Sequence, residues 1–292
     1  MLHADPETDP GTDPAELHIL VRRHGTGGLP SELLTRLAAD RDATRDPFLV
    51  DYLDGVLTGS GAFLGLPLLE RVRAAAALSA EEMATLLVAD VVAHERAVDA
   101  ADPARHRRRV RHALRFVAVM TRTPLAEVDL PAFPGGPAEP WFARTAHPVT
   151  GEHDDVVLVR ILQAREMLFT VLADDVRSAT LAVRDGRTAE AQELVAHAAT
   201  MLDRATMLSR VIAIPLAGDV RSERYERFAA ACGPLGKRLR EARPDTLAGA
   251  VAADQGSDLV AALDRLDEAR RRWSGRLTAD AARGPVRVAD AA

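Results

Sequence analysis

The sequence predicts an all-α protein, and three observations support this fold class. Alanine, leucine, arginine, glutamate and aspartate dominate the 292 residues, while aromatic residues make up only 4%, which is typical of helical proteins. Apolar residues recur at helical spacing through most of the chain. Helix-capping signals precede several of these segments, such as Ser79 followed three residues later by Glu82. We therefore expect a helical bundle with a substantial core, since hydrophobic residues make up 47% of the chain.

The elements can be placed in order from their turn and capping residues. Residues 1–14 contain three Asp-Pro pairs and are expected to form a disordered tail. A glycine-rich turn ends the first helix, Ser31 is the expected N-cap of the second, and Asp102 with Pro103 begins a later one. We expect helices at about 15–23 and 31–40, two more that begin at Pro47 and after Ser79, and others at about 103–122, 153–184, 188–213, 222–243 and 256–275.

Residues 123–150 are rich in proline and glycine and interrupt this series of helices. We interpret them as a long ordered loop over a pocket and not as a linker between domains. Residues 15–277 are then expected to form a single helical domain, followed by a frayed C-terminus at 278–292.

Composition and charge exclude several functions. The formal net charge of −6 argues against a broad nucleic-acid interface. The single Cys232 excludes an intrachain disulfide framework and fits a reducing cytoplasm. The chain shows neither a signal peptide nor an apolar run near the ~18 residues of a membrane span. It also lacks the H-E-x-x-H, C-x-x-C and G-x-S-x-G motifs. We expect a cytoplasmic protein that binds no nucleic acid and no membrane.

The segment from His153 to Arg227, about a quarter of the chain, carries the most specific pattern. It contains His153-Asp154-Asp155, then Leu158-Val159-Arg160-Ile161-Leu162-Gln163-Ala164-Arg165-Glu166-Met167-Leu168-Phe169, a turn at Arg184-Asp185-Gly186, then Ile214-Pro215-Leu216 and Tyr225-Glu226-Arg227-Phe228. It resembles the haem-binding core of the tryptophan 2,3-dioxygenase superfamily. In that family the distal helix has the pattern H-D-E-x-L-F-I-x-x-H-Q-x-x-E-L-W-F. The turn after this helix is N-G, and the segments L-E-T-M and F-x-x-F-R follow. One departure is that the family's distal histidine is Leu162 here.

The resemblance implies a bundle like that of the tryptophan 2,3-dioxygenase fold, a histidine-ligated haem b, and an aromatic amino acid bound over the iron. It places Leu162 at the haem and Gln163, Arg165, Tyr225 and Arg227 at the substrate. The arginine of the family's F-x-x-F-R grips the substrate carboxylate, and a bidentate guanidinium suits that task. The alternative is that Arg227 lies on the surface and that Glu166 with a neighbouring arginine forms only a helix-surface pair.

The segment Arg109–Val117 is similar to the family's proximal helix, written R-x-R-H-x-x-x-V. By this similarity His112 would ligate the iron, and Arg109 and Arg111 would pair with the haem propionates. In the family this helix follows the distal helix, whereas here it precedes it. A solvated basic helix face is the alternative interpretation.

Other histidines remain candidates for the iron. His94 falls on an otherwise apolar helix face and is our candidate for a distal acid–base group, although it could also be a ligand or a core residue. His153 could simply cap its helix. His197 lies about 20 Å along the bundle from the presumed haem, at ~1.5 Å per residue, and is expected to be structural. His147 could reach a pocket mouth, and His106 is expected at the surface.

Three features favour the hydroxylase branch of the superfamily over the indole-ring dioxygenases. The distal histidine is replaced by Leu162, the region before the core is long, and the region after it is short. We therefore expect a homo-oligomeric enzyme that hydroxylates tyrosine or a derivative to the catechol with peroxide or O2, in a natural-product pathway. An indole-ring dioxygenase and a haem-free helical binding protein are the alternatives.

Overall fold

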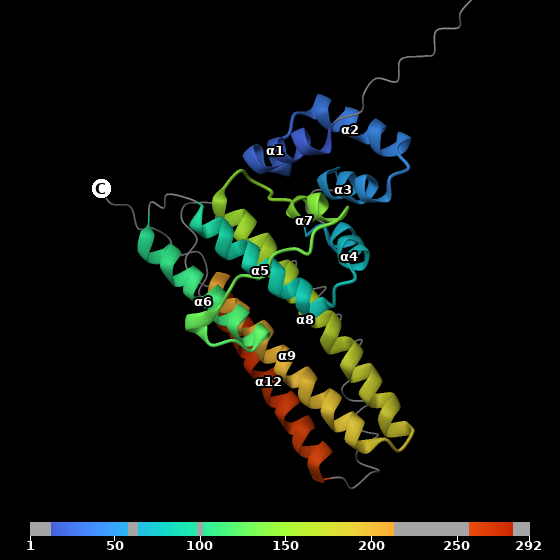
Figure 1. The fold of residues 1–292 in the computed structure, drawn as a ribbon, viewed down its shortest axis with the longest axis vertical. Helices are drawn as coiled ribbons and strands as arrows, with labels where there is room; N and C mark the ends of the chain where they lie inside the picture. The colour runs from blue at the N-terminus through green and yellow to red at the C-terminus, as the bar shows by residue number, and fades with distance from the viewer. Residues whose placement is uncertain (1–12, 58–63, 98–101, 213–256, 283–292) are drawn as a thin grey trace, which may run out of the picture. The chain divides into compact units, whose positions relative to one another are not determined.

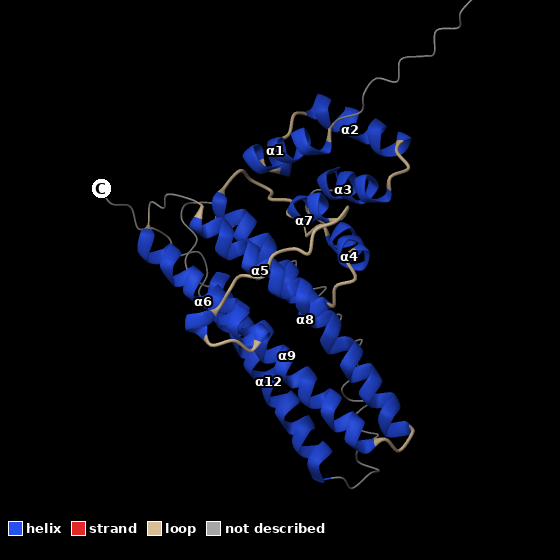
Figure 2. Cartoon of the chain, in the orientation of Figure 1, coloured by secondary structure: helices blue, strands red, loops and turns tan. Residues whose placement is uncertain are grey.

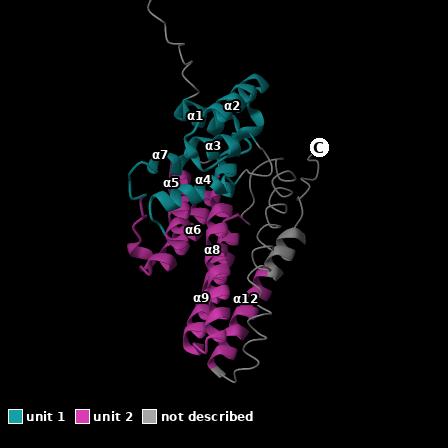
Figure 3. Ribbon diagram, turned by 90° about the vertical axis from the view of Figure 1, so that its right-hand side faces the viewer, with its two compact units in different colours: residues 1–78, 133–159 teal, residues 79–132, 160–292 magenta. Residues whose placement is uncertain are grey.

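The computed structural model describes residues 13–57, 64–97, 102–212 and 257–282 of the chain. Within these ranges every regular element is a helix and none is a strand (Figures 1 and 2). The predicted all-α fold class is therefore confirmed. The chain divides into two compact units, Met1–Leu78 with Phe133–Val159 and Ser79–Ala132 with Arg160–Ala292 (Figure 3).

Unit 1 is built from short helices. They are α1 (Pro14–His24), α2 (Ser31–Ala43), α3 (Pro47–Leu57), α4 (Leu66–Ala75) and α7 (Glu139–Arg144), with the first turns of α8 (His153–Arg184). Helix α3 packs against α2 and α4, and α4 packs against α7. After α1 the chain turns at Gly25, where the φ of 72° suits glycine, and the next amide, that of Thr26, donates to the carbonyl of Pro148 at 2.9 Å. This contact ties the segment before α8 to the N-terminal helices.

Unit 2 contains the long helices. They are α5 (Ala80–Arg96), α6 (Pro103–Thr121), most of α8, α9 (Thr188–Ile212) and α12 (Ser257–Ala282). Helix α6 packs against α5 and α9, and α9 packs along α12. The turn between α8 and α9 has Gly186 at a φ of 72°, and the amide of Arg187 donates to the carbonyl of Ala182 at 2.8 Å, which satisfies the end of α8. The predicted helices at 153–184 and 188–213 are thus confirmed almost to the residue.

Most predicted helix starts are also confirmed. Ser79 and Glu82 form the expected capping box of α5, and the Asp102 carboxylate accepts from the amides of Ala104 and Arg105 at 3.0 Å. Ser31, in contrast, is not the N-cap of α2. The amide of Leu34 donates to the carbonyl of Pro30 at 3.0 Å, so the cap position is one residue earlier and no side chain caps this helix.

The segment at 123–150 is more helical than predicted. It contains a 3₁₀ turn, η3 (Leu125–Glu127), and the helix α7, and within it the chain passes from unit 2 to unit 1. Helix α12 extends to Ala282, beyond the predicted end near 275. The helix predicted at 222–243 and the site residues Tyr225 and Arg227 lie outside the described residues. No helix among the residues that the structure describes is long and apolar enough to cross a membrane.

Candidate functional site

Helix α8 carries a row of polar side chains into the interior of the protein. Arg160, Gln163, Arg165 and Glu166 are each at most 2% exposed. Burying charged groups is costly unless each is paired or hydrogen-bonded. These residues therefore do not form the helix-surface pair that was the alternative interpretation of Glu166, and the part of α8 that resembles the family's distal helix is polar and buried.

Arg160 and Gln163 form a connected pair on this row. The Nε of Arg160 lies 2.6 Å from Oδ2 of Asp90 on α5, and a terminal nitrogen of Arg160 donates to Oε1 of Gln163 at 3.0 Å. The guanidinium thus links α5 to α8 and fixes the orientation of the Gln163 amide. Leu162, between them in sequence, is 1% exposed and offers no polar group.

Arg165 lies against the aromatic ring of Trp273. Its guanidinium carbon is 5.1 Å from the ring centroid of Trp273 on α12, within the range of a cation–π interaction. Trp273 in turn meets Phe169 edge-on, with centroids 5.3 Å apart. The aromatic platform from α12 therefore positions a buried cation next to the Gln163 segment.

On α6 the predicted iron ligand, His112, is half-buried and surrounded by cations. Burial lowers the pKa of His112 below its ordinary value, and repulsion from Arg115, Arg111 and Arg210 lowers it further. The imidazole is thus neutral at physiological pH, which is the state that ligates iron. Arg111 and Arg115 are exposed on the same helix.

Arg109 and His106, also on α6, have different surroundings from those expected. Arg109 is fully buried and one of its terminal nitrogens donates to Oε1 of Glu95 on α5 at 3.1 Å. The Nδ1 of His106 lies 2.6 Å from the other Glu95 oxygen, and its side chain is only 12% exposed. The expectation that His106 lies at the surface is therefore wrong, because α5 packs against α6 and places a buried carboxylate beside it. Arg109, likewise, is part of neither a solvated basic face nor an open cationic site.

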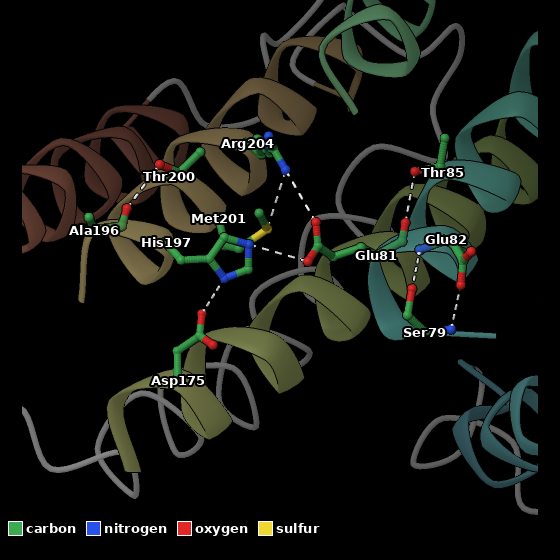
Figure 4. A network of polar contacts seen from close by, with 10 residues as sticks. All are labelled: Ser79, Glu81, Glu82, Thr85, Asp175, Ala196, His197, Thr200, Met201 and Arg204. Atoms are coloured by element: carbon green, nitrogen blue, oxygen red, sulfur yellow. Dashed lines mark hydrogen bonds and ion pairs between the residues drawn. The ribbon is translucent and has the colours of Figure 1, made fainter. Parts of the chain in front are cut away.

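His197 has the structural role that its place along the bundle predicted. Its Nδ1 lies 2.7 Å from Oδ2 of Asp175 on α8, and its Nε2 lies 3.3 Å from Oε1 of Glu81 on α5 (Figure 4). Glu81 also binds Arg204 at 3.3 Å. Both ring nitrogens of His197 face carboxylates, so this imidazole joins three helices and has no nitrogen left for iron.

The remaining histidines are placed as follows. His94 is half-buried in the last turn of α5, after the buried residues of the same face. His153 begins α8 in unit 1 and is half-buried. His147 is fully buried rather than at a pocket mouth, because its ring packs over Gly55 and Gly65, where a Cβ atom on either would lie within 3.0 Å of it.

No family model, no curated protein and no solved structure matches this chain. The resemblance to the tryptophan 2,3-dioxygenase superfamily therefore rests on the sequence alone, in the segments 109–117 and 153–228.

Proposed function

We propose that the chain is a haem-dependent oxygenase that hydroxylates an aromatic amino acid, tyrosine or a derivative of it, to the catechol with peroxide or O2. The observation that carries this proposal is the neutral, half-buried imidazole of His112 among three arginines. We further infer a homo-oligomer, as the resemblance implies, and a cytoplasmic location, which the single cysteine favours.

The residues around His112 fit haem b in their chemistry. Iron ligation requires the free lone pair of a neutral imidazole, and Arg111, Arg115 and Arg210 all disfavour its protonation. The same guanidiniums can pair with the two propionates, since arginine binds carboxylates through charge-assisted hydrogen bonds. Arg109 is not needed for this role, because it is held by Glu95. When bound, the haem supplies the iron at which the oxidant is activated.

The row on α8 would hold the substrate. A polar group that enters a buried site interacts more strongly with fixed charges and dipoles than it does in water. Arg160 fixes Gln163, and Trp273 fixes Arg165, so both predicted substrate residues have set orientations. His94 is the proposed acid–base group on the distal side, and Tyr225 and Arg227 stay predictions for the substrate carboxylate.

The choice of hydroxylation over indole dioxygenation rests on Leu162. This side chain is buried and cannot accept a hydrogen bond from an indole N–H. An unpaired buried donor costs about 1–3 kcal/mol, or up to about a hundredfold in affinity. A phenol ring places no donor at this position provided that its hydroxyl binds a different partner, such as His94, and tyrosine should then bind better than tryptophan.

The decisive experiment is hemin titration of the purified full-length protein, followed by turnover. We expect a Soret band at a stoichiometry of one haem per chain, a band shift at lower concentrations of tyrosine than of tryptophan, and a product heavier by one oxygen. A protein that takes up no hemin would leave the haem-free binding protein as the better proposal. Ring-opened tryptophan with two added oxygens would instead identify an indole dioxygenase.

A further inference from the structure

A cavity of about 900 Å³ lies beside α6 in unit 2, and His112 is not among the residues that line it. Four arginines line it: Arg96 from α5 and Arg107, Arg108 and Arg111 from α6. Its volume falls within the ~300–1,000 Å³ of small-molecule sites. The arginines that the sequence shows as a basic run are therefore gathered at a concave site.

Among the described residues, the positive charge of this cavity is offset only in part, by Asp102 at the start of α6, whose pKa is lowered by the amide of Arg105 and then by the charges of Arg105 and Arg108. None of these four arginines forms an ion pair with any residue that the structure describes. One carboxylate, Glu95, is in the lining, but its two oxygens are engaged by His106 at 2.6 Å and Arg109 at 3.1 Å. The chain as a whole carries a net charge of −6, so this concentration of cations is local. An anion in the cavity would relieve the repulsion between the guanidiniums.

The lining also has an apolar component. Val110 and Leu114 from α6 and Leu125 from η3 complete the cavity wall. Guanidiniums bind phosphate and carboxylate oxygens in pairs, whereas aliphatic side chains offer no polar contact. The wall therefore suits a molecule that has both anionic groups and an apolar body.

We propose that this cavity binds a small organic polyanion, with two or more phosphate or carboxylate groups on a short apolar body. A nucleic-acid strand is disfavoured because the lining has no phenylalanine, tyrosine or tryptophan ring on which a base could stack. Only Arg111 is common to this cavity and to the surroundings of His112, so the inference goes beyond the oxygenase proposal.

The test is calorimetric titration of the full chain with inorganic pyrophosphate and with citrate. Arg107→Gln/Arg108→Gln should weaken binding about tenfold or more, because two charge-assisted contacts are lost. Arg96→Gln is a second variant, from the other helix. Arg122→Gln/Arg184→Gln is the matched control, since it removes the same charge from exposed positions of unit 2 that do not line the cavity. Exposed substitutions of this kind should leave the helical circular dichroism unchanged.

The preferred probe shows whether the ligand carries phosphates or carboxylates. Failure of the wild-type chain to bind either probe would overturn the proposal, as would an equal loss in the control variant, which would indicate a non-specific charge effect. Tighter binding of a single-stranded oligonucleotide than of both probes would also overturn it in favour of nucleic acid. Hemin titration of Arg107→Gln/Arg108→Gln separates the two proposals, because we expect its hemin uptake to match that of the wild type.

Discussion

Two regions of unit 2 place histidines in opposite electrostatic surroundings. At the crossing of α5, α8 and α9, His197 lies between the carboxylates of Asp175 and Glu81. On the middle of α6, His112 lies among Arg111, Arg115 and Arg210. The difference shows that the position of a histidine along its helix does not determine the chemistry of its imidazole. The sign of the charge on the neighbouring side chains determines whether the imidazole pairs with them or keeps a free lone pair. An imidazole between carboxylates joins helices, whereas one among guanidiniums stays neutral and can donate its lone pair.

His106 lies on the same helix as His112, yet like His197 it is paired with a carboxylate. It shares Glu95 with Arg109, and both the carboxylate and the guanidinium are fully buried. A buried ion pair is weak evidence for net stability, but removing one partner leaves an uncompensated charge in the interior. Mutation of the Glu95–Arg109 pair should therefore destabilise the protein more than mutation of the carboxylates around His197.

The largest effect is expected for Glu95→Ala. Loss of the carboxylate breaks the buried ion pair with Arg109, and we expect a fall of about 3–5 kcal/mol in the free energy of unfolding. Glu81→Ala, on the same helix but at a partly exposed position beside His197 and Arg204, should cost about 0.5–1 kcal/mol. Urea denaturation followed by circular dichroism measures both. Equal losses would show that burial does not distinguish the two carboxylates.

A second prediction sets the two imidazoles directly against each other. His112→Ala should lower hemin affinity about a hundredfold or more, since loss of a metal ligand exceeds the 10–100-fold cost of losing an outer-shell partner. His197→Ala should leave hemin affinity unchanged, because both of its ring nitrogens face carboxylates. Titration followed by the Soret band measures both variants. A loss confined to His197→Ala would reverse the assignment, and retention in both would direct attention to His94 or His153.

These two regions also show how much the sequence could predict. The α8 and α9 boundaries followed from a glycine turn between two periodic segments, and the α5 and α6 starts followed from Ser79 and Asp102. Such signals depend only on neighbouring residues, so a single sequence is enough to recognise them. The prediction of Ser31 as an N-cap was wrong because its helix begins one residue earlier, with a hydrogen bond from the amide of Leu34 to the carbonyl of Pro30.

The surroundings of the site residues were harder to predict because they depend on partners that come from other helices. Arg160 is buried against Asp90, 70 positions earlier, and His106 against Glu95, which is on another helix. A charged residue on a helix indicates solvent unless its partner is known, and the partner is set by helix packing. The side-chain environment of Arg165 likewise depends on Trp273, over a hundred residues away.

The third prediction uses pH to sharpen the comparison. The pKa of His112 is lowered by burial and then by its three arginines, so the unfolded chain binds this proton more readily than the folded one. Stability should therefore fall as the pH drops below about 6.5, the ordinary imidazole value. For Asp175 the sign is opposite: burial raises its pKa despite the His197 contact, so its contribution is present at low pH and lost as the pH rises from about 4 through the raised value.

Unfolding free energies measured between about pH 7 and 5 test the histidine part, since His112→Gln should flatten the decline over that range. Asp175→Asn should alter the profile mainly below it. An unchanged slope in His112→Gln would mean that burial and the arginines do not keep this imidazole neutral, and the choice of His112 as the iron ligand would lose its physical basis.

The smallest predicted effect concerns unit 1, where the hydroxyl of a tyrosine is buried without a hydrogen bond to any described residue. Tyr52 on α3 is fully buried between the rings of Trp141 and His147, and its hydroxyl has no hydrogen-bond partner among the described residues. Burial raises its pKa, so the phenol stays neutral. A buried, unsatisfied hydroxyl costs free energy that its removal recovers, so Tyr52→Phe should stabilise the protein by about 1 kcal/mol.

Tyr52→Leu is the control, because it also removes the hydroxyl but leaves a cavity among the rings and should destabilise. If Tyr52→Phe destabilises in urea denaturation, the hydroxyl has a partner that holds it, and this aromatic cluster would become a candidate polar site of its own.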